Sequence, residues 1–322
     1  MFYRVTHQTA YAYDREVSVS HHVVQLRPRE LPWQRCLSHQ LCVRPDPGVE
    51  ASRTDYFGNH SVLVTLETAH REFEVIAGSL VEVLPRPSLA AMETPAWESV
   101  ATACGAPGWG DAAAAGEFRF ESPWVPQRPE IGAWAAESFA PGRGWLAAMA
   151  DLNARIHRDF VFDGTATTVT TPLAEVFAKR RGVCQDFAHV MLAAARAMGL
   201  PARYVSGYLE TLPPPGKARL VGADASHAWI AAWCPGLGWV DFDPTNDLLP
   251  SDRHVTVAWG RDFGDVSPVR GVLLGSGDHR IRVSVDMEAV DGGASDGGGR
   301  SQSQSQSQSQ SQSQSQSFST PA

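Results

Sequence analysis

A change of hydrophobic periodicity near residue 200 is the feature that most constrains how this chain can fold. Between residues 129 and 198, apolar side chains recur every three or four positions, which is typical of helices that bury one face. Between residues 202 and 243 the apolar runs are shorter and end at glycine or proline, as strands do. Because the helices precede the strands and do not alternate with them, the pattern predicts an α+β domain in which helices pack on an antiparallel sheet.

The helices are expected at residues 129–139, 145–156, 171–182 and 184–199, and the strands at residues 202–209, 225–233 and 238–243. Thr171 and Pro172 provide a capping hydroxyl and a proline at the first helical position, which marks the start of the third helix. Gly182 follows three basic residues and is expected to end that helix. The Pro-Pro-Pro-Gly run at 213–216 predicts a loop between the first two strands.

The chain before these helices divides into two segments. Residues 1–86 contain short runs rich in β-branched and aromatic residues, which predict a β-rich N-terminal domain that packs on the other half and shapes its cleft. The Gly58-Asn59 pair lies between two such runs and predicts a hairpin. Residues 87–128 are rich in proline, alanine, glycine and tryptophan, and we expect a linker or extended loop there.

The predicted core domain with its C-terminal extension covers residues 129–290, and residues 291–322 form a tail. The tail is Gly/Ser/Asp-rich and then a Ser-Gln repeat from 301 to 317. Such a segment has almost no apolar side chains to bury, so it cannot offset the entropy that ordering would cost. We predict that it is disordered and has no role in catalysis.

Composition excludes several classes of partner. A formal net charge of −8 makes a nucleic acid an improbable ligand, and no basic run is present that would bind an anionic membrane. The first eight residues lack the basic start and apolar run of a signal peptide, and no stretch approaches a membrane span, so a cytoplasmic location is expected. Five scattered cysteines do not resemble a disulfide framework, and Cys36, Cys42 and Cys104 carry no functional signal.

Cys184 lies where a nucleophilic cysteine is expected. The predicted glycine stop at Gly182 ends one helix and Cys184 opens the next, which places the thiol at a helix N-terminus. The unpaired N–H groups and the dipole of that terminus favour thiolate over thiol, and the thiolate is the attacking species. The same N–H groups, that of Cys184 first, can hold the oxyanion of a tetrahedral intermediate.

A histidine and a carboxylate on the two following strands complete a possible triad. His227 lies on the strand 225–233, and Asp243 ends the adjacent antiparallel strand just before a proline. A carboxylate on one strand can fix the tautomer of an imidazole on the next, so that the other ring nitrogen faces the thiol. Asp241 points the same way along its strand and remains an alternative to Asp243, while Asp186 and His189 follow Cys184 on its helix, where we expect structural roles.

A metal site is the main chemical alternative. Cys184, His189, His227 and Cys234 are residue types that zinc accepts, but they lack the closely spaced ligand pairs of common zinc motifs. We therefore predict no metal and no cofactor. Trp229, Trp233 and Trp239 could line a substrate groove, although aromatic residues on sheet faces are more often core, and no site role is assigned to them.

Four motifs, in this order, resemble the core of bacterial transglutaminase-like proteins: Gly-Val-Cys-Gln-Asp-Phe-Ala at 182–188, Leu-Pro-Ala-Arg-Tyr-Val-Ser-Gly-Tyr at 200–208, His-Ala-Trp at 227–229 and Phe-Asp-Pro-Thr at 242–245. Residues 1–85, with Asp-Tyr-Phe-Gly-Asn at 55–59, resemble the β-domain that precedes this core in one bacterial subfamily, and 254–268 resemble its C-terminal extension. The resemblance implies a papain-like core with Cys184 as nucleophile, His227 as base and Asp243 as the orienting acid.

Members of this superfamily include proteases, amidases and amine transferases, so the resemblance leaves the reaction open. We expect a cysteine enzyme that hydrolyses a peptide, isopeptide or carboxamide bond through a thioester, with a peptide or protein as its substrate. The alternatives are a protein-glutamine amine transferase, which crosslinks, and a non-catalytic peptide-binding protein on the same fold. The oligomeric state is not predicted.

Overall fold

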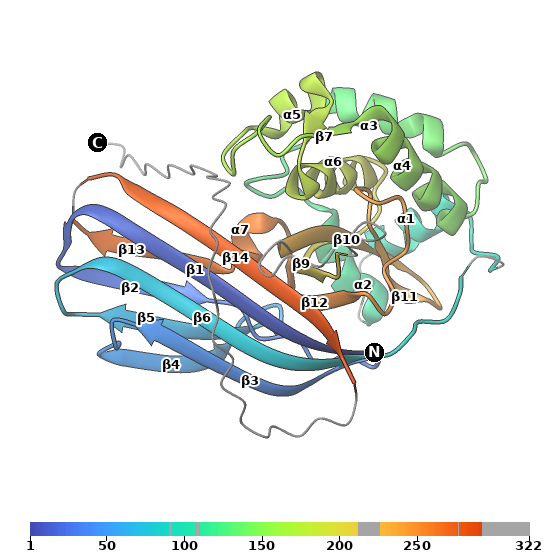
Figure 1. The fold of residues 1–322 in the computed structure, drawn as a ribbon. Coiled ribbons are helices and arrows are strands. Elements are labelled where there is room, and N and C mark those ends of the chain that lie inside the picture. Colours follow the sequence, from blue (N-terminus) through green and yellow to red (C-terminus); the bar gives the residue numbers. More distant parts are fainter. Residues whose placement is uncertain (90–91, 107, 109, 212–225, 276, 292–322) are drawn as a thin grey trace, which may run out of the picture.

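The computed structural model describes residues 1–89, 92–106, 108, 110–211, 226–275 and 277–291. Two four-stranded sheets form one half of the molecule, and helices cover a third four-stranded sheet in the other half (Figure 1). The prediction of an α+β core preceded by a β-rich domain is confirmed. The predicted loop at 213–216 and the tail from 292 onwards lie outside the described residues.

The β-rich half is a sandwich of antiparallel sheets with the strand orders β14-β1-β6-β3 and β13-β2-β5-β4. The N-terminal strands are β1 (Phe2–Val17), β2 (Val19–Val24), β3 (Gln34–Arg44), β4 (Val49–Thr54), β5 (His60–Leu66) and β6 (His70–Val83). Buried and less buried residues alternate along β6 from Phe73 onwards, because one face of the strand meets the apolar side chains of the other sheet. The predicted hairpin is present, since β4 and β5 pair and Gly58 adopts a positive φ in the turn between them.

Two C-terminal strands complete this sandwich. Strand β13 (Val269–Leu274) pairs with β2, and β14 (His279–Val290) pairs with β1 over almost its whole length. Residues 269–290 were expected to belong to the core domain, and the structure corrects that expectation. Strand β1 hydrogen-bonds to a neighbour on each side, β6 and β14, and β14 comes from the far end of the described chain.

The segment 87–128 also differs from the prediction of an extended linker. It contains the helices α1 (Trp97–Gly105) and α2 (Asp111–Gly116) and the short 3-10 helix η1 (Glu117–Arg119). Val100 and Cys104 of α1 are buried in the main core, together with residues of the later helices. Alanine is the strongest helix former, and the alanines of this segment outweigh the prolines and glycines that suggested a loop.

The remaining helices confirm the predicted pattern. They are α3 (Pro129–Ala135), followed by the 3-10 helix η2 (Ala136–Ser138), then α4 (Trp145–Asp159), α5 (Leu173–Lys179) and α6 (Cys184–Ala197). Both ends of α5 differ from the prediction. Pro172 is the N-cap residue and not the first helical residue, and no side chain caps this start. The helix ends at Lys179, followed by Arg180 in the left-handed conformation, and not at Gly182. Gly182 lies instead in the short strand β8 (Arg181–Gly182), which runs parallel to β7 (Val161–Phe162).

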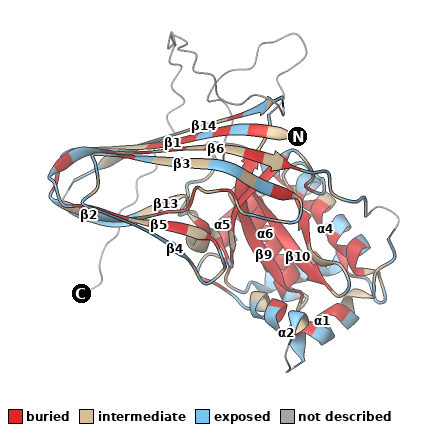
Figure 2. Ribbon diagram, turned by 90° about the horizontal axis from the view of Figure 1, so that it is seen from below, coloured by how far each residue is buried: buried red, intermediate tan, exposed pale blue. Residues whose placement is uncertain are grey.

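Helix α6 packs on the third sheet at the centre of the molecule. This sheet has the order β11-β10-β9-β12 and consists of β9 (Ala202–Leu209), β10 (Ser226–Cys234), β11 (Gly238–Phe242) and β12 (His254–Gly260). Figure 2 shows α6, β9 and β10 as mostly buried. Ala228 and Ile230 belong to the same core as α6, whereas Val205, Trp229 and Ala231 form a separate cluster on the other face of the sheet.

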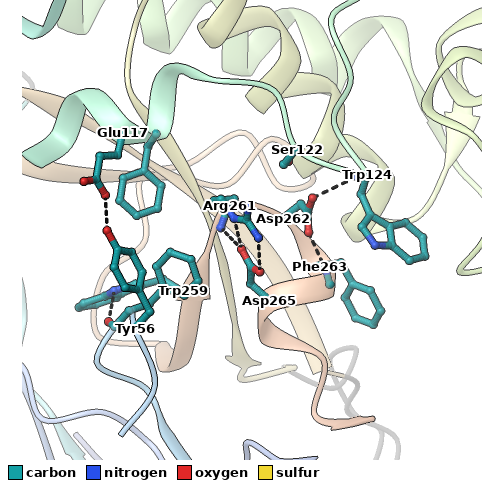
Figure 3. A network of polar contacts seen from close by, with 12 residues as sticks. Tyr56, Glu117, Ser122, Trp124, Trp259, Arg261, Asp262, Phe263 and Asp265 are labelled. Atoms are coloured by element: carbon teal, nitrogen blue, oxygen red, sulfur yellow. Dashed lines mark hydrogen bonds and ion pairs between the residues drawn. The ribbon is translucent and has the colours of Figure 1, made fainter. Parts of the chain in front are cut away.

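That other face meets the β-sandwich along the hairpin 55–59 and strand β12. The Trp259 indole N–H donates to the carbonyl of Phe57 at 3.0 Å, and the Tyr56 hydroxyl donates to Glu117 at 2.6 Å (Figure 3). Beyond β12, Arg261 forms an ion pair with Asp265 on the short helix α7 (Phe263–Val266). The sandwich is therefore anchored directly to the sheet that carries the candidate site. Among the described residues, no helix is both long and apolar enough to span a membrane.

Candidate active site

Cys184 is the first residue of α6 and is partly exposed. Val183 precedes it in extended conformation, so the helix begins at Cys184 itself. The first N–H groups of any helix have no partner within the helix, and Cys184 is the first residue of this one. The prediction that places this thiol at a helix N-terminus is confirmed.

Asp186 fixes this helix start. Its carboxylate accepts the Val183 N–H at 2.9 Å and the Thr167 hydroxyl at 2.6 Å, which confirms the expected structural role. Burial raises the pKa of Asp186, while those two hydrogen bonds oppose the rise. Gly182 is needed beside it, because a Cβ at that position would lie 2.4 Å from an Asp186 carboxylate oxygen. Gly182 thus lets the Asp186 side chain approach the backbone closely, and it does not end a helix.

His227 lies near the start of β10, opposite Gly207 on β9, and is buried. Its Nε2 is 2.8 Å from an oxygen of Asp243, and the Cys184 side chain is the second group whose interaction with the ring favours its protonated form. With Nε2 directed to the carboxylate, Nδ1 is the nitrogen left for the thiol. Burial lowers the pKa of His227, but the hydrogen bonds and charges of Asp243 and Cys184 outweigh it and raise that pKa to about 10.

Asp243 follows β11 directly and is fully buried. One carboxylate oxygen accepts the backbone N–H groups of Thr245 and Asn246 at 3.0 and 3.2 Å, and the other accepts the Asn246 side-chain amide at 2.7 Å. Burial alone would raise the pKa of Asp243, yet the hydrogen bonds from His227, His254 and Asn246 hold it well below its ordinary value. The carboxylate is therefore ionised and held rigidly beside His227.

Asp241, the alternative carboxylate, is engaged elsewhere. Its Oδ2 is 2.6 Å from Nη1 of Arg86, and both side chains are largely buried. Arg86 in turn stacks over the ring of Trp33, which holds the guanidinium in place. Of the two aspartates weighed from the sequence, the structure brings Asp243 to the histidine.

Two further residues at this site, His254 and Asn246, were assigned no role from the sequence. His254, at the start of β12, is buried, and its Nε2 is 3.2 Å from the same Asp243 oxygen that His227 contacts. Burial lowers the pKa of His254, whereas that of His227 is raised, so of the two histidines His227 is the one whose charged form is favoured. Asn246 could have been found from its position three residues after an aspartate in a proline turn, where side chains often bond the backbone.

The zinc set considered from the sequence is not assembled. The His189 ring accepts the Phe263 N–H at 3.2 Å, and burial lowers the pKa of His189 to about 3. The buried Cys234 thiol hydrogen-bonds to the carbonyl of the next residue, Pro235, at 3.6 Å. Both side chains therefore have partners away from Cys184. Within the described ranges, the group of residues close enough to share a metal ion is a different one: His227, Asp243 and His254.

The tryptophans near the site serve the core. Trp229 is fully buried on the sheet face opposite α6, with its ring 5.3 Å from the ring of His254 and edge-on to it. Trp239 packs against the same cluster, where the Arg203 guanidinium stacks on it. Trp233 is buried in the main core. These contacts agree with the expectation that the three tryptophans belong to the core.

The arrangement of Cys184, His227 and Asp243 can perform nucleophilic chemistry. A partly exposed thiol lies beside an imidazole, and a buried carboxylate orients that imidazole from the other side. Such an imidazole can take the proton of the thiol and return it to a leaving group. A helix N-terminus at the nucleophile supplies N–H donors for a developing oxyanion.

Comparison with known proteins places this geometry in a family. A model of the bacterial transglutaminase-like N-terminal region matches residues 3–82, and a model of the transglutaminase-like superfamily matches residues 146–244. The second match includes Cys184, His227 and Asp243. The boundaries of the first match agree with the N-terminal strands β1 to β6.

Full-length relatives cover both halves. An uncharacterised protein of Mycobacterium tuberculosis is 39% identical over 300 residues, which span 91% of this chain and 94% of that protein. A solved structure of a candidate cysteine protease from Cytophaga hutchinsonii has a TM-score of 0.68 at 19% identity and covers 92% of each chain. A protein-glutamine gamma-glutamyltransferase of Pseudomonas aeruginosa is 41% identical over 76 residues, which are 23% of this chain and 11% of that protein.

Proposed function

Since the chain belongs to the transglutaminase-like superfamily, we propose that it is a cysteine-nucleophile enzyme that hydrolyses an amide bond of a peptide or protein. The observation that carries the proposal is the position of the His227 ring. Its Nε2 is 2.8 Å from the Asp243 carboxylate, and its interaction with the Cys184 side chain helps to raise the pKa of the imidazole. A buried histidine between a thiol and a carboxylate has the two neighbours that a general acid–base needs. A purely structural histidine would not need a thiol beside it.

In the first half-reaction the Cys184 sulfur attacks the substrate carbonyl carbon. The thiol proton has passed to Nδ1 of His227, and the carbonyl electrons move to oxygen, where N–H groups at the start of α6 stabilise the charge. When the tetrahedral intermediate collapses, the C–N bond breaks and the leaving amine takes the proton from His227. The products are a thioester on Cys184 and a free amine.

In the second half-reaction an acceptor attacks the thioester. His227 takes a proton from the acceptor, the carbon–sulfur bond breaks, and the thiolate of Cys184 is restored. Water as acceptor gives a carboxylic acid, so the net reaction is hydrolysis of a peptide, isopeptide or side-chain carboxamide bond. Water is favoured because it is present at far higher concentration than any amine. Asp243 keeps its charge throughout and stabilises the imidazolium.

One observation favours a second function, the transfer of the acyl group to an amine. The chain is 41% identical over 76 residues to a protein-glutamine gamma-glutamyltransferase. The thioester is common to hydrolysis and transfer, and the difference lies only in which acceptor reaches it. A transferase would crosslink a glutamine side chain to an amine through the same three residues.

The test uses a mixed peptide pool in ¹⁸O-water, with and without a primary amine, and reads the products by mass spectrometry. We expect wild type and Cys42→Ala, a control at an exposed cysteine on β3, to give cleaved or deamidated peptides that carry ¹⁸O. Cys184→Ala should give none. Amine adducts in place of ¹⁸O would favour transfer. Equal activity of Cys184→Ala, or inactivity of wild type on every peptide, would count against the proposal.

A further inference from the structure

Two imidazoles converge on one oxygen of Asp243. Nε2 of His227 is 2.8 Å from that oxygen and Nε2 of His254 is 3.2 Å from it. The Asn246 amide donates to the same oxygen at 2.7 Å. A carboxylate oxygen has two lone pairs in its plane, so three donors exceed its capacity. One imidazole is enough to form a triad, and the proposed reaction does not explain the second.

These three side chains present their ligand atoms as a metal site does. One ligand atom from each of the three side chains lies within 4.8 Å of the other two, and all three residues are buried. Zinc binds imidazole nitrogen and carboxylate oxygen at about 2.0–2.2 Å, which separates the ligands of a tetrahedral site by about 3.3 Å. Movements of about an ångström or less per side chain would bring the ligand atoms to those positions.

We propose that His227, Asp243 and His254 bind a divalent transition-metal ion, zinc by the chemistry of its ligands, and that the bound ion holds the enzyme inactive. Two imidazoles and one carboxylate suit zinc, whereas calcium and magnesium take mostly oxygen ligands and several waters. The carboxylate offsets half of the charge of the ion. The fourth position is left for water or for substrate.

The surroundings support the ligand positions. The other oxygen of Asp243 is held by the N–H groups of Thr245 and Asn246, so the carboxylate cannot rotate freely. The Trp229 and His254 rings pack in a T-shaped arrangement, which restricts the plane of the imidazole. Outer contacts of this kind orient metal ligands and raise affinity. Gly207 permits the contact, because a Cβ there would lie 2.6 Å from the Trp229 ring.

The expected effect on activity follows from where the protons go. A neutral imidazole that binds a metal through Nε2 carries its proton on Nδ1, which is the nitrogen left for Cys184. His227 then cannot accept the thiol proton. An imidazolium that binds the ion releases one proton to solvent and reaches the same state. The claim that the ion inhibits the enzyme rests on the proposed function. The claim that these three residues bind the ion does not.

The experiment measures binding by calorimetry in the full chain, prepared without a histidine tag and stripped of metal. Zinc chloride is titrated into wild type, Cys184→Ala, His254→Gln and His279→Gln, the last a control on β14. We expect one zinc ion per chain in wild type, Cys184→Ala and His279→Gln with similar affinity. His254→Gln should bind zinc at least about tenfold more weakly. Loss of a residue that only orients a ligand already weakens metal affinity by about tenfold or more, and loss of a ligand should weaken it at least as much.

A second measurement does not depend on any variant folding. Cobalt(II) added to wild type should give visible ligand-field bands without the intense near-ultraviolet band of a cobalt–thiolate bond. Such a thiolate band, or loss of zinc binding in Cys184→Ala, would place the ion on the cysteine and overturn the proposal. Equal affinity in His254→Gln, or no saturable binding by wild type, would overturn it too. None of these outcomes decides whether Cys184 is the nucleophile.

Discussion

Asn59 binds both backbone groups of Trp259, two hundred residues away in the sequence. Its Nδ2 donates to the Trp259 carbonyl at 2.8 Å, and its Oδ1 accepts the Trp259 N–H at 3.0 Å. Asn59 is fully buried in the hairpin turn between β4 and β5, and Trp259 is on β12 of the sheet that carries the candidate site. A side-chain amide thus replaces the strand partner that β12 lacks on this edge, and it joins the sandwich to the core.

Replacing Asn59 by alanine should therefore destabilise the protein. The change leaves a buried N–H and a buried C=O of Trp259 without partners, at a cost of about 2–4 kcal/mol. Urea denaturation of wild type and Asn59→Ala measures the difference, and Ser52→Ala on the exposed strand β4 is the control. A loss no larger than that of the control would mean that water satisfies Trp259 and that the junction is loose.

Asp243→Asn should reduce turnover by about 10²-fold or more, because an amide neither fixes the tautomer of His227 nor stabilises its charge. The comparison is Asp241→Asn, which breaks the buried ion pair with Arg86. That variant should lose about 3 kcal/mol of stability while each folded molecule keeps its turnover. Kinetics and denaturation of both variants separate the roles. Full activity in Asp243→Asn would transfer the orienting role to Asp241.

The raised pKa of His227 makes its contribution to stability depend on pH. A histidine whose pKa is about 10 when folded and about 6.5 when unfolded stabilises fully below about pH 6.5. That contribution is lost as the pH rises towards 10. The free energy of unfolding of wild type, measured with EDTA present, should fall more steeply over this interval than that of His227→Gln. Parallel curves would mean that the folded imidazole is not protonated.

The candidate triad was predictable because its members lie on elements with strong local signals. The stripe after Cys184 defined α6, and β9 was predicted with the observed bounds. His227 and Asp243 belong to neighbouring antiparallel strands, so their meeting follows from the register of β10 and β11. Strands β10 and β11 follow each other closely in the sequence, so their pairing could be predicted.

The remaining features depend on contacts that no local pattern encodes. His254 reaches Asp243 although β9 and β10 separate its strand from β11, so neither spacing nor periodicity indicates the contact. Strands β13 and β14 join two sheets whose other strands, β1 to β6, all come from the N-terminal part of the chain. Their apolar pattern would fit the core domain equally well. Asp241 and Asp243 have the same strand parity, and they are distinguished by partners that the parity does not reveal: Arg86 for Asp241, and His227 with the turn residue Asn246 for Asp243.

Gly207 lies between His227 on β10 and Thr256 on β12, where the sheet has no room for a side chain. A Cβ there would be 2.1 Å from the Val255 carbonyl oxygen and 2.6 Å from the Trp229 ring. We expect Gly207→Ala to cost about 3 kcal/mol or more, since the backbone oxygen cannot move without separating β9 from β12.

Gly78 on β6 is the matched control for this prediction, because a Cβ there meets nothing within 4 Å and the residue is also within a strand. Gly78→Ala should be neutral or slightly stabilising, since alanine reduces the entropy of the unfolded chain. Thermal and urea denaturation of the two variants test the pair. If Gly207→Ala were as stable as Gly78→Ala, Trp229 would have room to move, and its support of His254 beside the candidate active site would not be fixed by packing.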